Sequence, residues 1–142
     1  MNRLDDEVLK CAKRVVQMSR DRGQEVLDYS DDSMEVVEEM LAEAAAHAQR
    51  MSDAAVARLS QDVGCYILEL ARRNHGGVFR WDNARNEPAV VVSGPQLSIT
   101  LFCWDKVRAR LRDGAPNNVA SFYASYVERV RQAQPGDRVV FL

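Results

Sequence analysis

The sequence predicts one α+β domain that covers residues 1–142. Three stretches with helical periodicity come first, three short stretches rich in β-branched and aromatic residues follow, and two more helical stretches precede an apolar C-terminal end. Helices grouped apart from strands are typical of α+β folds, not of sheets wound alternately with helices. Because 46% of the residues are hydrophobic, the chain can stand on a hydrophobic core alone.

The first two helices are predicted from apolar spacing and from the residues at their ends. Leu4 begins a series of apolar residues spaced by three and four, and Gly23 then marks a C-terminal stop. Ser30 is a good N-cap for the second helix. Asp31 and Asp32 then fall in its first turn, where the helix dipole favours negative charge.

The third helix is predicted to start at Ser52 or Asp53 and to end in the segment 74–77, whose glycines can take the left-handed turn that closes a helix. Its inward face is expected to carry Val56, Leu59, Val63, Tyr66, Ile67 and Leu70. Gly64 lies within this helix, where glycine costs about 1 kcal/mol relative to alanine. We therefore interpret Gly64 as a site of close helix packing.

Three strands are predicted at residues 78–82, 89–92 and 97–101, where β-branched and aromatic residues alternate with turn-forming connections. The connections at 83–87 and 93–96 are short, and short connections favour an antiparallel meander. The sequence therefore predicts a small antiparallel three-stranded sheet.

The C-terminal third is predicted to hold two helices and a last strand. Asp105 is expected to cap a helix that runs to about Arg112, and Asn117 or Asn118 is expected to cap the final helix. The apolar segment 139–142 follows a Pro-Gly turn, and we expect it to be a terminal strand or a docked tail.

The cysteines and the N-terminus favour a cytoplasmic protein. Cys11, Cys65 and Cys103 form no CxxC pair and leave an odd count, which favours a reducing compartment. The first seven residues are charged where a secretory signal needs an apolar run. No stretch approaches the roughly 20 apolar residues of a membrane span, so we expect no membrane partner.

Charge is divided unevenly along the chain. The net charge is −2, but residues 1–71 carry −7 and residues 72–142 carry +5. The segment 25–49 holds eight acids and no lysine or arginine. Such asymmetry concerns partners and association, not the fold. The candidate partner-binding residues are the acids of the second helix and its approach: Asp31, Asp32, Glu35, Glu38, Glu39 and Glu43.

No motif predicts catalysis, a metal site or a cofactor. His47 and His75 lack ligand spacing to another His or Cys, and there is no G-x-S-x-G elbow or glycine-rich phosphate loop. A thiol nucleophile would need Cys65 or Cys103 with His75, yet Cys65 lies in an apolar helix, where thiols are usually inert. The net acidity and the spread of the C-terminal arginines around their helix argue against nucleic acid.

The junction between the third helix and the first strand is the most distinctive segment. Glu69, Arg73, His75 and Trp81 place a carboxylate, a guanidinium, an imidazole and an indole around one corner. These side chains are candidates for a polar pocket. The favoured alternative is a helix C-cap in which the cations serve the dipole and Trp81 packs on the sheet.

The segments Leu27–Met40 and Gly64–Gly77 together resemble a class of small, mostly uncharacterised bacterial proteins. Those proteins share a D-[YF]-S-x-x-S helix start and a G-x-Y-x-x-E-x-x-R-x-N-x-G-G helix end that leads into a small sheet. Some look like immunity proteins encoded beside secreted antibacterial toxins. The resemblance covers roughly residues 24–112 and rests on caps, core and turn residues. It implies a shared fold and transfers no catalytic residue.

Three hypotheses for function remain open at this stage. The first is a cytoplasmic immunity-type protein that binds and neutralises a cognate toxin through the acidic helix, without enzymatic activity. The second is a secretion chaperone or adaptor for an exported effector. The third is a small-ligand or enzymatic site at the corner of Glu69 and Trp81. Self-association could use the aromatic last helix, with Phe122, Tyr123 and Tyr126, although these residues also suit a core.

Overall fold

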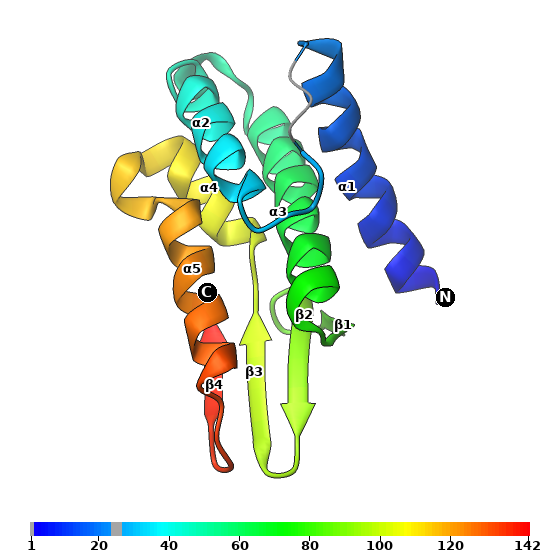
Figure 1. Ribbon diagram of the computed structural model, residues 1–142. Coiled ribbons are helices and arrows are strands. Elements are labelled where there is room, and N and C mark those ends of the chain that lie inside the picture. Colours follow the sequence, from blue (N-terminus) through cyan, green and yellow to red (C-terminus); the bar gives the residue numbers. More distant parts are fainter. Residues whose placement is uncertain (1, 24–26) are drawn as a thin grey trace.

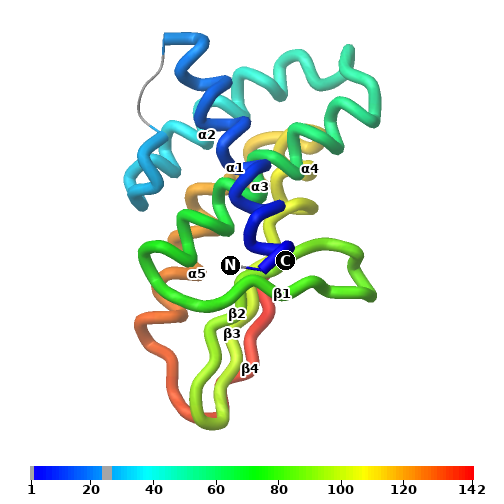
Figure 2. The backbone as a smooth tube through the Cα atoms, turned by 90° about the vertical axis from the view of Figure 1, so that its right-hand side faces the viewer, coloured from blue at the N-terminus to red at the C-terminus, as the bar shows by residue number. Residues whose placement is uncertain are grey.

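The longest helix, α3 (Asp53–His75), runs through the centre of the computed structural model, which describes residues 2–23 and 27–142. Helix α1 (Arg3–Asp21) lies on one side of α3, and α2 (Ser33–Ala45) lies on the other (Figures 1 and 2). Residues 63–71 of α3 are all buried, since neighbouring elements cover this stretch on every side. The remaining helices are α4 (Trp104–Asp113) and α5 (Val119–Arg131).

One four-stranded sheet lies below the helices in Figure 1, in the order β1-β2-β3-β4. The strands are β1 (Val78–Asp82), β2 (Glu87–Gly94), β3 (Leu97–Leu101) and β4 (Arg138–Phe141). The first three form the predicted antiparallel meander. The apolar C-terminal segment is a strand that pairs parallel with β3. Helices α4 and α5 supply the crossover that a parallel pair requires.

Capping residues explain why most predicted boundaries are correct. Ser52 Oγ accepts from the backbone N–H of Ala55 at 3.1 Å, and Asn118 Oδ1 accepts from that of Ser121 at 2.9 Å. Gly76 closes α3 with φ 81°, a conformation that favours glycine. The predicted α+β order of three helices, a meander, two helices and a final strand is therefore confirmed.

Three predicted boundaries need correction. Asp105 does not cap α4, because the helix already begins at Trp104 and places Asp105 in its first turn. Asp31 and Asp32 form a turn ahead of α2, although Ser30 Oγ does accept from the Ser33 N–H at 3.3 Å. The second strand starts at Glu87, two residues before the predicted start at residue 89, because the turn before it spans fewer residues than expected. Glu25, the first acid of the base-free segment, lies outside the described residues.

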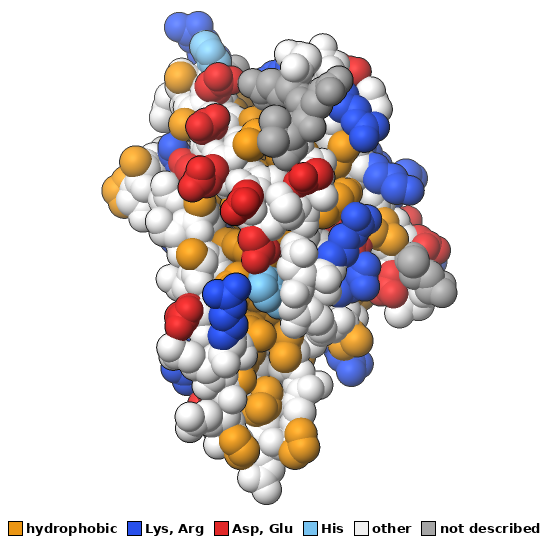
Figure 3. Space-filling model, in the orientation of Figure 1, with side chains coloured by type: hydrophobic (Ala, Val, Ile, Leu, Met, Phe, Trp, Pro, Cys, Tyr) orange, Lys and Arg blue, Asp and Glu red, His pale blue; other side chains and the backbone are white. Residues whose placement is uncertain are grey.

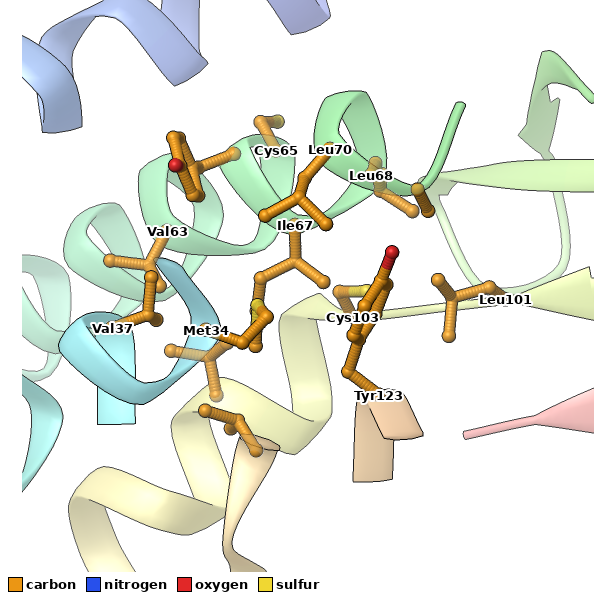
Figure 4. Packing of buried hydrophobic residues seen from close by; sticks show 14 of the residues in the cluster. Met34, Val37, Val63, Cys65, Ile67, Leu68, Leu70, Leu101, Cys103 and Tyr123 are labelled. Carbon is orange, nitrogen blue, oxygen red and sulfur yellow. The ribbon is translucent and has the colours of Figure 1, made fainter. Parts of the chain in front are cut away.

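The core lies where the helices α1, α2, α3, α4 and α5 and the sheet meet. Figure 4 shows Met34 of α2, Ile67 of α3 and Tyr123 of α5 converging around Cys103. Gly64 is a close-packing site, as predicted, because a Cβ there would lie 2.6 Å from Cδ1 of Trp104. Helices α3 and α4 could not approach each other this closely with a larger residue at position 64.

Candidate functional site

The two sequence segments that carry the resemblance contact each other through Tyr29 and Tyr66. The Tyr66 hydroxyl accepts from the backbone N–H of Tyr29 at 3.0 Å and lies 2.8 Å from Ser33 Oγ. Asn74 Nδ2 donates to the Tyr29 carbonyl at 2.7 Å. The segment before α2 is therefore hydrogen-bonded to the C-terminal half of α3, at Tyr66 and Asn74. These polar residues hold the fold together.

Glu69 and Arg73 complete the same junction. The Glu69 carboxylate is fully buried and accepts from Arg72 Nε at 2.8 Å, while Arg73 Nε lies 3.5 Å away from it. The Arg73 guanidinium also lies 3.8 Å from the centre of the Tyr29 ring, a cation–π contact. Since Glu69 is already paired, its negative charge is compensated within the fold.

Asp31 and His75 meet at the junction of α2, α3 and α5. His75 Nε2 lies 2.7 Å from Asp31 Oδ2, and the Tyr123 hydroxyl donates to Asp31 Oδ1 at 2.5 Å. Burial, followed by the hydrogen bond to Asp31, raises the pKa of Tyr123 well above its usual value. The sequence placed Asp31 and His75 in two different candidate sites, and the structure makes them one polar junction.

The four residues of the predicted corner pocket make contacts in three different directions. Glu69 and Arg73 face Tyr29, and His75 faces Asp31. Trp81 packs edge-on against Trp104, with ring centres 6.3 Å apart. A groove that Trp81 does line contains none of the other three side chains. The four side chains therefore do not share one pocket. Gly76 closes α3, as the C-cap interpretation expects, but Trp81 contacts Trp104 of α4.

The six acids of the candidate partner surface fall into two groups. Asp31 is held by His75 and Tyr123, as described above. Glu38 is held more tightly: its Oε2 accepts from Arg110 Nε at 2.7 Å, and its Oε1 accepts from the Val119 backbone N–H at 2.9 Å. Because Glu38 and Arg110 are only 14% and 8% exposed, this pair belongs to the core.

The other four acids, Asp32, Glu35, Glu39 and Glu43, form what we call the acidic stripe. They follow one another at spacings of three, four and four, which places them along one solvent-exposed side of α2. Acidic side chains gather over α2 on the face shown in Figure 3. Within the part of the chain that the structure describes, no cation pairs with these four carboxylates.

A groove of about 360 Å³ runs beside the acidic stripe, between α2 and α5. Its α2 wall includes Asp32, Met34 and Glu35. Its α5 wall is made by Ala120, Tyr123, Ala124, Val127, Glu128 and Arg131. The rim holds carboxylates and the Arg131 guanidinium. A long cationic side chain could bind beside the carboxylates while its aliphatic part contacts the apolar floor.

The sequence interpretation missed the part that α5 plays in this groove. The sequence predicts that Tyr123 belongs to the core or to a self-association surface. In the structure Tyr123 is buried and also lines the groove. The available signal was the pair of small residues, Ala120 and Ala124, four residues apart on one side of α5. Small residues on a helix face leave room beside the next helix.

The described residues contain no group of three or more His, Cys, Asp or Glu side chains arranged to hold a metal ion. No described helix is both long enough and apolar enough to cross a bilayer. In comparisons with known proteins, no family model, no curated protein and no solved structure matches this chain.

Proposed function

We propose that this protein is a non-enzymatic binding protein that uses the acidic stripe and the adjoining α2–α5 groove to bind a basic surface of a protein partner. The resemblance to immunity proteins supports a toxin as this partner, which the complex would neutralise. The observation that carries the proposal is the set of four exposed carboxylates on α2 and the turn before it, none of which forms an ion pair within the described structure.

The acidic stripe has an energetic cost in the free protein. Glu35, Glu39 and Glu43 are four residues apart, and like charges at this spacing each destabilise a helix by about 0.2–0.5 kcal/mol. The core face of α2 is formed by Met34 and Val37, so the charged side chains of the acidic stripe lie outside the core. A basic partner would relieve the repulsion, and the uncompensated field would speed its approach.

The groove gives the partner a place for an anchor. A lysine or arginine of the partner could place its charge among Asp32, Glu35 and Glu128 while its methylene groups cover Val127. Arginines that fill such central pockets often dominate the binding energy of an interface. The stripe would then govern the association rate, and the groove would govern the dissociation rate.

The test replaces Glu35, Glu39 and Glu43 together with glutamine and measures association with the product of the adjacent gene. We expect the association rate at low salt to fall about tenfold or more, and its dependence on salt to weaken. The same variant should lose its ability to rescue growth when the toxin is expressed in the same cells.

A matched control replaces Asp5, Asp6 and Glu7 on α1 with the corresponding amides. It changes the net charge by the same amount as the test variant, but on another helix. This control should bind at nearly the normal rate. Equal slowing in both variants would mean that only net charge matters and would exclude the acidic stripe. A secretion chaperone would instead bind an unfolded segment of the adjacent gene product more tightly than its folded domain.

A further inference from the structure

A second groove, of about 790 Å³, lies on the other side of α3, away from the acidic stripe. Its lining includes Leu4, Val8 and Cys11 together with the charged Arg3 and Glu7 from α1, Gln61 and Cys65 from α3, and Trp81, Pro88 and Trp104. The lining is mainly apolar, and it brings together two cysteines that are far apart in the sequence. This groove has no part in the function proposed above.

Cys11 and Cys65 face each other across the α1–α3 contact. Both cysteines line the same groove, the two thiols shift each other's pKa, and Arg14 Nη1 lies 3.5 Å from Cys11 Sγ. Arg14 is itself held by Asp62 at 3.2 Å. In Figure 4 the Cys65 side chain projects from the side of α3 opposite to Ile67.

The two thiols differ in their ionisation and exposure. The interaction with the Cys65 thiol, helped by the charge of Arg14, lowers the pKa of Cys11 to about 7 against the opposing effects of burial and of the Asp62 carboxylate. The pKa of Cys65 is raised, first by its interaction with Cys11 and then by burial. Cys11 is partly exposed at the groove, whereas Cys65 is buried beneath it. This arrangement pairs an accessible nucleophile with a second thiol next to it.

We propose that Cys11 and Cys65 form an oxidisable thiol pair whose substrates are hydroperoxides, with Cys11 as the attacking sulfur and Cys65 as the resolving one. The Cys11 thiolate attacks one peroxide oxygen, the O–O bond breaks, and the leaving oxygen takes a proton to become water or an alcohol. Cys11 becomes a sulfenic acid.

Cys65 then attacks the Cys11 sulfur and closes a disulfide. The S–O bond breaks, and the hydroxyl group leaves as water with the proton of the Cys65 thiol. Overall, two thiols lose two electrons and the peroxide gains them. The product is a covalent link between α1 and α3.

The test treats the reduced protein with one equivalent of hydrogen peroxide and maps the cysteines by mass spectrometry after digestion. We expect an intact mass lower by two hydrogen atoms and a Cys11–Cys65 cross-linked peptide. The Cys65→Ala variant should stop at a Cys11 sulfenic acid that dimedone traps. The Cys103→Ala variant should still form the cross-link, since Cys103 is buried elsewhere in the core.

A second measurement follows the rate of Cys11 alkylation by iodoacetamide against pH. The midpoint should lie near 7 in the folded protein and near the ordinary thiol value of about 8.5 in denaturant. Arg14→Gln should raise the folded midpoint, and Arg14→Lys should restore most of the shift. Absence of both the cross-link and the dimedone adduct, or a folded midpoint equal to the denatured one, would overturn the proposal.

Discussion

Two buried tyrosine hydroxyls have opposite hydrogen-bonding environments. The Tyr66 hydroxyl contacts the Tyr29 N–H and Ser33 Oγ. The Tyr126 hydroxyl is equally buried and has no hydrogen-bond partner among the described residues. Burial raises the pKa of Tyr126 accordingly. The same chemical change at the two positions should therefore have different effects on stability.

We expect Tyr66→Phe to lower the free energy of unfolding by about 1–3 kcal/mol, because the Tyr29 N–H loses its acceptor and Ser33 Oγ keeps only its bond to the Ser30 carbonyl. Tyr126→Phe should be neutral or slightly stabilising, since it removes a polar group that gains nothing from burial. Urea unfolding of both variants measures the difference. Equal losses at the two positions would contradict this hydrogen-bond assignment.

At the level of one element, helix α2 carries like charges on its exposed side, and their repulsion lowers the stability of the helix. Glu39 lies four residues from both Glu35 and Glu43, so it takes part in two repulsive pairs. Glu39→Gln should raise the free energy of unfolding by about 0.4–1 kcal/mol at low salt, and the gain should shrink as salt is added.

Asp53→Asn is the matched control for Glu39→Gln, because it makes the same change in net charge. Asp53 lies in the first turn of α3 and its Oδ1 is 2.6 Å from Arg112 Nη2. Neutralising Asp53 should therefore lower stability. Thermal unfolding at two salt concentrations compares the signs. A loss of stability in Glu39→Gln would show that the stripe is stabilised by the fold itself.

At the level of the whole molecule, Glu38 connects three helices. It lies on α2, pairs with Arg110 of α4 and accepts from the first backbone N–H of α5 at Val119. Removal of one member of a buried ion pair leaves the other charge without compensation, at a cost of about 3–5 kcal/mol. This one carboxylate therefore bonds α2 to both α4 and α5.

Glu38→Ala should lower the free energy of unfolding by about 3 kcal/mol, with the slope against denaturant unchanged, because one cooperative unit is affected. The neighbouring exposed variant Glu39→Ala should leave the free energy of unfolding unchanged or raise it by up to about 1 kcal/mol, because it removes two repulsive pairs. Guanidinium unfolding of the pair measures both values. If Glu38→Ala were as mild as Glu39→Ala, the pair with Arg110 would not be a core interaction.

The fold class and most element boundaries could be predicted because they depend on local physics. Apolar spacing identified α1, α2 and α3, and the capping side chains of Ser52 and Asn118 act within three residues of their own positions. Turn residues such as Gly76 likewise work through their own backbone angles. These features need no knowledge of how distant parts of the chain meet.

By itself, the sequence determined this α+β order and the set of acids that could face a partner. Only the tertiary structure decided which acids are engaged, since Asp31 meets His75 across 44 residues and Glu38 meets Arg110 across 72. It also decided that β4 pairs parallel with β3 and that Cys11 faces Cys65. The reason is physical: spacing shows which side of a helix a residue is on, but only helix packing determines what that side contacts.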